Sequence, residues 1–210
     1  MVRLPSFSTM NLPRLRRLGT GAGLVLASGS PRRQSILREA GISFEIMNPN
    51  FDETIMAGIS PAKLATTLAH QKVLSIPTDG VRAYLGCDTI VVCDEIILNK
   101  PVDPSDALRM LQLLSGRTHS VFTGLSLRDS RKEIFLETVE ESRVRFNPLS
   151  KDQLLAYIAT GEPLDKAGAY GIQGMGGILV DSVIGNIDNV VGLPIGALER
   201  LAEQYWENYA

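Results

Sequence analysis

The sequence has few cysteines and few histidines. Its two cysteines, Cys87 and Cys93, fall in one expected strand, where six residues span about 20 Å, far beyond disulfide reach. Its two histidines, His70 and His119, are isolated in the sequence, so no zinc-ligand spacing is present. We therefore expect unpaired thiols in a reducing, cytoplasmic compartment and two histidines with structural roles.

A surplus of positive charge is also missing. Lys and Arg total 21 against 23 Asp and Glu, which gives a formal net charge of -2. This balance excludes a whole-molecule field that would recruit nucleic acid or an anionic membrane. No stretch is long and apolar enough to span a bilayer. We expect neither a nucleic-acid partner nor a membrane partner, and any anion site must be local.

The N-terminus lacks acidic residues, the first of which is Glu39. Residues 1–23 carry four arginines but no apolar core of a secretory signal. Two interpretations stay open, a disordered arm and an organelle targeting peptide, so we set these residues apart from the fold. The remaining chain, residues 24–210, is long enough to bury the core of one domain.

Local punctuation predicts the elements. Ser-Pro and Asp-Pro pairs open helices at Ser30, Ser60 and Asp103, and Ser150 with Gln153 forms a capping box. Helices alternate with strands at first and strands cluster later, which predicts an α/β fold with a mixed sheet. The expected helices are 31–40, 61–75, 104–115, 151–160 and 194–206, and the expected strands are 24–27, 44–47, 84–93, 96–98, 119–128, 134–146 and 177–183.

The helix that begins after Ser30 carries two cations, Arg32 and Arg33, in its first turn. Each opposes the helix dipole by roughly 0.3–1 kcal/mol unless an anion binds there. The buried strand 24–27 leads through the small residues 28–30 into this helix, and strand, small-residue loop and helix N-terminus together favour a phosphate site. The alternative is that both arginines are ordinary solvated residues.

Asp88 interrupts an apolar run of the central-strand type. A carboxylate there must be paired, metal-bound or facing a cleft, since burying it alone costs on the order of several kcal/mol. The alternatives are a functional acid, which we favour, and a structural one paired with backbone or an arginine. Lys72 follows Leu64 and Leu68 at helical spacing, and taken singly it indicates a packed stem with its charge in water.

The segment 168–177 is too rich in glycine for a helix or strand, and such a loop lets backbone approach a ligand closely. Within it, Gln173 has the donor and acceptor needed to read a base edge. With Lys100, Lys166 and the acid Glu53, the inventory suits a nucleoside polyphosphate held by cations and divalent metal, with a carboxylate to bind metal or activate water. No Walker A string occurs.

Several longer strings complete the pattern: LASGSPRR at 26–33, GCDTIV at 86–91, KPVD at 100–103, LSGRTHSVFTG at 114–124, GEPLDKAGAYGIQG at 161–174 and VVGLP at 190–194. On these residues the chain resembles the Maf family, the septum-formation-protein homologues that act as nucleoside triphosphate pyrophosphatases. The resemblance covers the chain from about residue 24 to its end. It implies an α/β fold with a mixed twisted sheet flanked by helices, bilobed with a central cleft, and a homodimer.

The resemblance also implies a reaction, in which a nucleoside triphosphate is hydrolysed between its α and β phosphates with Mg²⁺ or Mn²⁺. Asp88 would be the proton acceptor and, with Glu53, a metal ligand. Arg32, Thr89 and Gln173 match the family's specificity positions. The implied substrate-binding residues are Ser30, Arg32, Arg33, Glu53, Lys72, Thr89, Lys100, Lys166 and Gln173.

The string at 165–174 belongs to the branch of the family that resembles dTTP/UTP pyrophosphatases. We therefore expect hydrolysis of dTTP and UTP, with housecleaning of modified pyrimidine nucleotides as a hypothesis. Three alternatives remain: a 7-methyl-GTP pyrophosphatase, a nucleotide-sensing regulator of septum formation that binds without turnover, and a nucleotidyltransferase that needs a second substrate.

Overall fold

The computed structural model describes residues 6–50 and 58–209. The chain divides into two compact units, each described here by itself. The α3 unit, named after one of its helices, comprises the described residues of 6–88, 123–140 and 192–209, and the α4 unit comprises 89–122 and 141–191. Strands β3, β5 and β6 each continue from one unit into the other.

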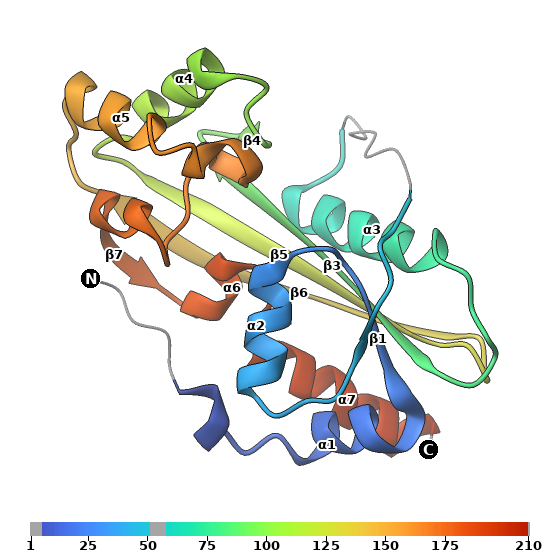
Figure 1. Ribbon diagram of the computed structural model, residues 1–210. Helices are drawn as coiled ribbons and strands as arrows, with labels where there is room; N and C mark the ends of the chain where they lie inside the picture. The colour runs from blue at the N-terminus through green and yellow to red at the C-terminus, as the bar shows by residue number, and fades with distance from the viewer. Residues whose placement is uncertain (1–5, 51–57, 210) are drawn as a thin grey trace. The chain divides into compact units, whose positions relative to one another are not determined.

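The described strands form one seven-stranded sheet in the order β2-β1-β3-β5-β6-β7, with β4 paired to β3 (Figure 1). Strand β1 is parallel to β2 and β3, whereas β4 is antiparallel to β3 and β7 to β6. The predicted α/β fold with a mixed sheet flanked by helices is therefore confirmed, and the central cleft stays a prediction. The bounds are β1 Leu24–Ala27, β2 Glu45–Ile46, β3 Ala83–Cys93, β4 Ile96–Leu98, β5 Thr118–Asp129, β6 Ile134–Phe146 and β7 Val180–Ile184.

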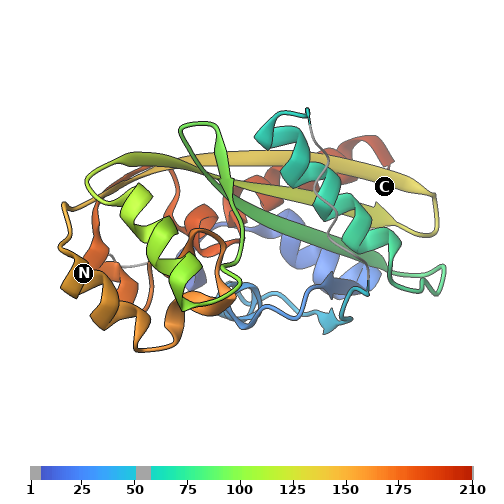
Figure 2. The ribbon, with the colours of Figure 1, turned by 90° about the horizontal axis from the view of Figure 1, so that it is seen from above.

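Helix α3 (Pro61–Leu74) packs closely on β3 and β5 in the α3 unit (Figure 2). A Cβ at Gly86 of β3 would lie 2.0 Å from the carbonyl oxygen of Ala69, and one at Gly124 of β5 would lie 2.3 Å from that of Ala65. Glycine is therefore required at both positions for space, since backbone meets backbone there. This close approach fixes α3 over the end of β3.

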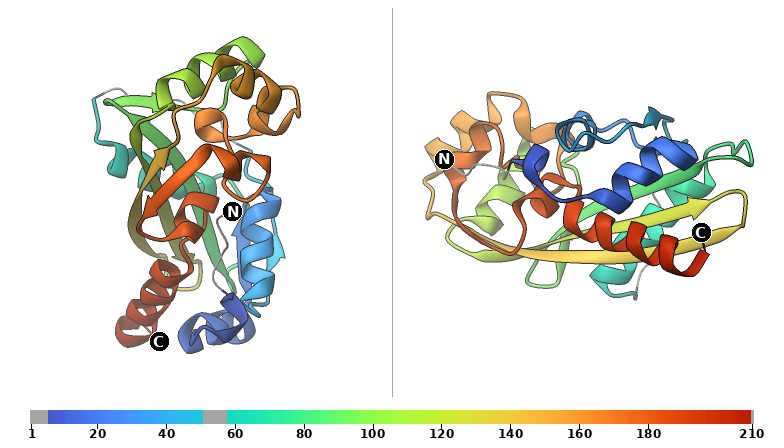
Figure 3. Two further views of the ribbon diagram at one scale, coloured as in Figure 1. Left: turned by 90° about the vertical axis from the view of Figure 1, so that its left-hand side faces the viewer. Right: turned by 90° about the horizontal axis from the view of Figure 1, so that it is seen from below.

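Residues 6–23 are folded, in contrast to the disordered arm that was one interpretation of the sequence. They include helix α1 (Pro13–Arg17) and a π-helical turn (Leu18–Gly23), and Leu15 and Leu18 are fully buried. Helix α1 lies beside α7 (Ile195–Tyr209), as both panels of Figure 3 show. The apolar spacing that carries this packing is too short for a sequence pattern to reveal.

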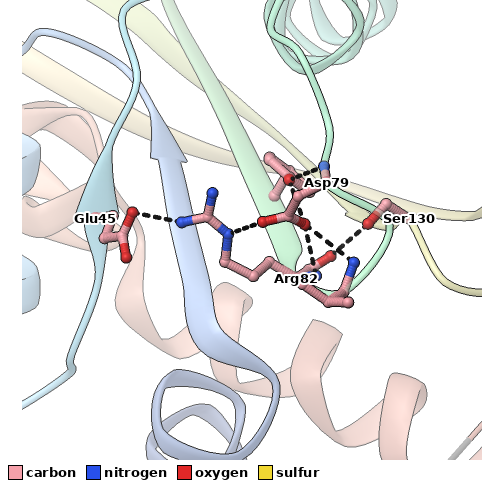
Figure 4. A network of polar contacts seen from close by, with 6 residues as sticks. Glu45, Asp79, Arg82 and Ser130 are labelled. Atoms are coloured by element: carbon pink, nitrogen blue, oxygen red, sulfur yellow. Dashed lines mark hydrogen bonds and ion pairs between the residues drawn. The ribbon is translucent and has the colours of Figure 1, made fainter.

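An arginine network joins three segments of the α3 unit (Figure 4). The Arg82 guanidinium lies between the carboxylates of Glu45 on β2 and Asp79 in the α3–β3 loop. The Arg82 carbonyl accepts a hydrogen bond from Ser130 Oγ at 2.9 Å, at the β5–β6 turn. Hydrogen bonds from the Val81 backbone, then from Tyr84 and Arg82, lower the pKa of Asp79 to about 2, although desolvation acts in the opposite direction.

In the α4 unit, helix α4 (Pro104–Leu114) lies beside α5 (Lys151–Ile158), which begins with the predicted capping box (Figures 1 and 2). An aromatic group of His119, Phe146 and Tyr170 packs edge to face, with ring centroids 4.8 to 5.4 Å apart. Between α5 and β7 the chain forms three short 3₁₀ helices, η3 (Glu162–Asp165), η4 (Ala167–Ala169) and η5 (Met175–Leu179).

Several boundaries differ from the sequence prediction. The strand expected at 177–183 begins only at Val180, because Gly177, Ile178 and Leu179 belong to η5. Helix α6 (Ile187–Val191) was not predicted, whereas α2 (Pro31–Glu39) and α7 fall close to their expected ranges. Both cysteines are free and buried, as expected. None of the described helices is long and apolar enough to cross a membrane.

Candidate active site

The carboxyl ends of β1 and β3 lie side by side in the α3 unit. These parallel strands pair Ala27 with Gly86, so Ser28 and Asp88 both follow the paired residues at the same edge of the sheet. In open α/β sheets, ligands bind outside the carboxyl ends of the strands. The edge that holds Asp88 is therefore where the fold favours a binding site.

Asp88 forms an ion pair with Lys72 of α3, in which Lys72 Nζ donates to Asp88 Oδ1. Both side chains are only 9% exposed. The interpretation of Lys72 as a snorkelling surface residue is thus wrong, because its ammonium group is buried against a carboxylate. The close contact of α3 with Gly86 produces this pair, since it places the helix turn after Ala69 over the residues that follow Gly86.

Arg33 in the first turn of α2 is buried as well. Its Nε donates to the carbonyl oxygen of Gly192 at 2.8 Å, and its Nη1 donates to Ser28 Oγ at 3.0 Å. Two of the five guanidinium donors thus fasten the side chain to the loop before α2 and to the segment before α7. The alternative interpretation of Arg33 as a solvated surface residue is not what the structure describes.

The start of α2 is shaped by small residues. Ser30 is the N-cap residue, and its backbone N–H donates to Ser28 Oγ at 3.3 Å, but its own side chain makes no capping hydrogen bond. A Cβ at Gly29 would lie 2.9 Å from Asn48 Oδ1, so the loop is tight. Arg32, the next residue of the first turn but one, is half-buried.

Cys87 reports the electrostatics beneath this edge of the sheet. Burial raises the pKa of its thiol to about 11, while the charges of Arg33 and Lys72 lower it and the charge of Asp88 raises it. All three charged groups are therefore near one buried sulfur, and the α3 unit brings Arg33, Lys72 and Asp88 together. The thiol itself stays protonated near neutral pH and is no nucleophile.

The α4 unit carries the other described candidates, Thr89, Lys100, Lys166 and Gln173. Thr89 is half-buried and directly follows Asp88 in β3, whereas Lys100 and Gln173 are exposed. The Asn99 carbonyl, next to Lys100, accepts a hydrogen bond from the Gly168 N–H at 3.2 Å. The residue after β4 and the turn at Gly168 are therefore joined.

Lys166 is half-buried and held locally. Its Nζ donates to the Glu162 carbonyl and to Asp165 Oδ1, both at 2.6 Å. Its stem lies against the glycine-rich loop, since a Cβ at Gly171 would be 2.7 Å from Lys166 Cε. A phosphate-binding role for Lys166 thus competes with two contacts to its own turn.

The predicted metal ligands are Asp88 and Glu53, and Glu53 lies outside the described residues. Among residues 6–50 and 58–209, no three His, Cys, Asp or Glu side chains are grouped so that they could hold a metal ion. Mg²⁺ is often bound by one or two carboxylates together with substrate phosphates, and Asp88 supplies a hard oxygen donor of this kind. The donor chemistry at Asp88 therefore fits a metal held jointly with a triphosphate.

Sequence reasoning missed two groups that hold candidate residues in place. Ser28 was noted as part of a small-residue loop, but not as the acceptor for Arg33. Glu162 was not noted at all, although its carboxylate accepts hydrogen bonds from the glycine-rich loop that carries Gln173. The one available signal was an acid placed just after the glycine that ends α5, at the beginning of the string 161–174.

Comparison with known proteins decides the family. A family model described as Maf-like protein matches residues 23–205, most of the chain. The chain belongs to the Maf family. The family match begins next to β1 and includes every candidate residue named above.

Relatives of this Maf chain span nearly their whole length in the comparison. A protein of Bacillus cytotoxicus named dTTP/UTP pyrophosphatase is 46% identical over 182 residues, which cover 86% of this chain and 94% of the relative. A protein of the same name from Symbiobacterium thermophilum is 46% identical over 183 residues, 87% of this chain and 93% of the relative. One from Moorella thermoacetica is 45% identical over 179 residues, with 85% and 92% covered.

Proposed function

We propose that this Maf-family chain is a nucleoside triphosphate pyrophosphatase that hydrolyses dTTP and UTP to the monophosphate and pyrophosphate. The names of relatives that are 45 to 46% identical over most of the chain support this activity and this pair of substrates. One structural observation carries it: the buried Lys72–Asp88 pair beside Arg33 at the carboxyl ends of two parallel strands.

The cations have a clear task in this reaction. A triphosphate is strongly anionic, and the N-terminus of α2 offers it a positive dipole together with Arg32 and Arg33. Arg33 is already fastened by Ser28 and Gly192, so little side-chain freedom is lost when it meets the substrate. Lys72 adds positive charge at Asp88, where attack on the α phosphorus takes place.

Asp88 acts as the proton acceptor. The oxygen of a water molecule forms a bond to the α phosphorus, the bond from that phosphorus to the bridging oxygen breaks, and pyrophosphate leaves. The proton of the water passes to the Asp88 carboxylate. Lys72 stabilises the ionised form of this carboxylate at the start of the cycle, because the two charges are paired in a buried place.

A divalent cation, Mg²⁺ or Mn²⁺, supplies charge compensation at the phosphate oxygens when it is bound, and Asp88 is the described residue that would help to hold it. Glu53, Lys100 and Lys166 are proposed to contact the phosphates. Thr89 and Gln173 are proposed to contact the nucleoside, with Gln173 offering a donor and an acceptor to the base edge.

The proposal includes a cytoplasmic homodimer. Two free buried thiols fit a reducing compartment. The dimer rests on the family resemblance, and sedimentation equilibrium of the full chain measures it directly.

The test is pyrophosphate release from a panel of natural and modified triphosphates with Mg²⁺ or Mn²⁺. We expect dTTP and UTP to be turned over fastest. Asp88→Asn should lower kcat by about 10²- to 10⁴-fold, the usual contribution of a general base, while triphosphate binding measured by calorimetry is largely retained.

Each other outcome identifies a rival. Binding without pyrophosphate release would indicate a nucleotide sensor, and release only with a second substrate would indicate a nucleotidyltransferase. Preference for 7-methyl-GTP would move the chain to the other branch of the family. Retained turnover in folded Asp88→Asn would remove Asp88 from the proton-acceptor role.

A further inference from the structure

The glycine-rich loop of the α4 unit is wrapped around one carboxylate. Glu162, the first residue of η3, accepts hydrogen bonds from Met175 N–H at 2.8 Å on Oε2 and from Gly176 N–H at 3.2 Å on Oε1. The Tyr157 hydroxyl also donates to Oε1, at 2.9 Å. This side chain thus holds the part of the loop that follows Gln173.

The part of the loop that precedes Gln173 is held by the same pair of side chains. The Tyr157 hydroxyl accepts a hydrogen bond from Gly171 N–H at 3.1 Å while donating to Glu162. Backbone N–H groups on both sides of Gln173, at distances of two and two to three residues, are therefore fixed by Tyr157 and Glu162. The side chain of Gln173 itself stays exposed.

The glycines of the loop are needed for space around this pair. A Cβ at Gly174 would lie 2.4 Å from Glu162 Oε2, and one at Gly176 would lie 2.6 Å from the Tyr157 hydroxyl. Gly174 has a φ of -93°, a value open to most residues, so conformational freedom is not the reason for glycine there. The loop is built to approach the carboxylate closely.

The charge of Glu162 suits this role. Desolvation raises the pKa of Glu162, but the hydrogen bonds from Met175, Gly176 and Tyr157 and the charge of Lys166 outweigh it, and the pKa is lowered overall. The carboxylate is therefore ionised at neutral pH and acts as an acceptor on both oxygens. Burial raises the pKa of Tyr157, which remains a hydroxyl able to donate.

We infer that Glu162 and Tyr157 are positioning residues that fix the backbone of residues 171–176 and thereby aim Gln173 at the nucleobase. This inference rests on the proposed function, in which Gln173 reads the base edge. Neither residue is required to touch the substrate. Their effect is on which base is accepted, because a loop that moves by a fraction of an ångström presents a misplaced amide.

Glu162→Gln is the sharpest variant, because it keeps the shape and replaces one acceptor oxygen with a donor facing N–H or O–H groups. We expect the ratio of kcat/KM for dTTP to kcat/KM for dCTP to fall about tenfold, the size of one lost recognition hydrogen bond, with KM for dTTP raised and kcat changed less. Tyr157→Phe should shift the ratio in the same direction. Asp152→Asn, an exposed carboxylate-to-amide change on α5, is the matched control and should leave the ratio unchanged.

A double-mutant cycle separates positioning from general damage. In a Gln173→Ala background, adding Glu162→Gln should not lower the dTTP/dCTP ratio further, because the aimed side chain is already gone. An unchanged ratio in folded Glu162→Gln, or an equal loss for every triphosphate, would overturn the inference. If that variant does not fold, Tyr157→Phe carries the same test.

Amide hydrogen exchange on the wild-type chain adds a readout that needs no turnover. Gly171, Met175 and Gly176 should be protected, and fast exchange at all three would contradict the inference. Failure of the proposed function has a different signature, since wild type would then release no pyrophosphate from dTTP or UTP, or would show no selectivity to lose.

Discussion

The two units present their candidate residues in different ways. In the α3 unit, Arg33, Lys72 and Asp88 stand on regular elements and are buried, and their partners include one another and fixed backbone carbonyls. In the α4 unit, Lys100 and Gln173 lie in irregular segments and are exposed. Groups that handle a charged reaction centre are placed on rigid elements here, and groups proposed to read the substrate are placed on loops that need separate support.

The largest expected effect comes from breaking the buried ion pair of the α3 unit. Lys72→Met leaves the Asp88 carboxylate buried without its ammonium partner, and we expect turnover to be abolished and the free energy of unfolding to fall by about 3–5 kcal/mol. Urea unfolding measures the stability change. The control is Lys72→Met with Asp88→Asn, which removes both charges and should recover most of the stability but no activity. A single variant as stable as wild type would show that the pair is not desolvated.

A second prediction concerns acid, which should act on the α4 unit first. Burial lowers the pKa of His119 to about 4, and its Nε2 lies 2.8 Å from the Tyr170 hydroxyl. Because the folded protein disfavours protonation, the contribution of neutral His119 is complete above pH 6.5 and is lost as pH falls from 6.5 toward 4. The loss is at most about 3 kcal/mol.

The α3 unit has its acid-sensitive group at lower pH. Desolvation raises the pKa of Asp129, but hydrogen bonds from Arg131 and Tyr205 lower it further, to about 2. Its contribution is therefore complete above about pH 4 and is lost only between pH 4 and 2. Urea unfolding at pH 7, 5.5 and 4.5 should show a decline that His119→Gln reduces. An equal decline in that variant would mean that His119 is not the group responsible.

A third prediction contrasts two glycines that are both short of space. Gly86→Ala in the α3 unit forces a Cβ against backbone of α3, so we expect about 1–3 kcal/mol of lost stability together with lost activity, because Lys72 moves with the helix. Gly174→Ala in the α4 unit meets only the end of the Glu162 side chain, so we expect a small stability change and a lowered dTTP/dCTP ratio.

Thermal unfolding and kinetics of both glycine variants make that comparison, with Gly196→Ala in α7 as the control. A Cβ at Gly196 has no neighbour nearer than 3.8 Å, and alanine in a helix is favourable by up to about 1 kcal/mol. Equal stability losses for Gly86→Ala and Gly174→Ala would contradict the distinction between a rigid and an adjustable contact.

The sequence was sufficient where the signal is local. Ser60, Asp103 and Ser150 cap helices where they were predicted to, since a cap is a short-range interaction between a side chain and the next few N–H groups. Pairing across elements was harder to predict. Lys72 by itself indicates a surface lysine, and only the contact of α3 with Gly86 shows why it is buried with Asp88.

The supports of the loop were beyond prediction for a different reason. Glu162 binds backbone N–H groups, and such bonds do not depend on which side chains the partner residues carry, so no complementary residue appears in the sequence. The beginning of β7 was misplaced for a related reason, because the glycines before it serve close packing rather than a strand. Glu53, predicted as a metal ligand, lies outside the described residues and stays a prediction.

The smallest expected effect tests the N-terminal stretch. Glu199 of α7 accepts hydrogen bonds from the backbone N–H groups of Arg14 at 3.0 Å and Leu15 at 2.8 Å, so a carboxylate from the far end of the chain caps α1. Glu199→Gln keeps the shape but removes the charge that favours a helix N-terminus, and we expect about 1 kcal/mol of lost stability with turnover unchanged. Glu203→Gln, an exposed change on the same helix, is the control in thermal unfolding. Equal melting temperatures for the two variants would show that α1 docks through its buried leucines rather than through this cap, and a loss of turnover would show that the stretch before β1 supports the site as well as the fold.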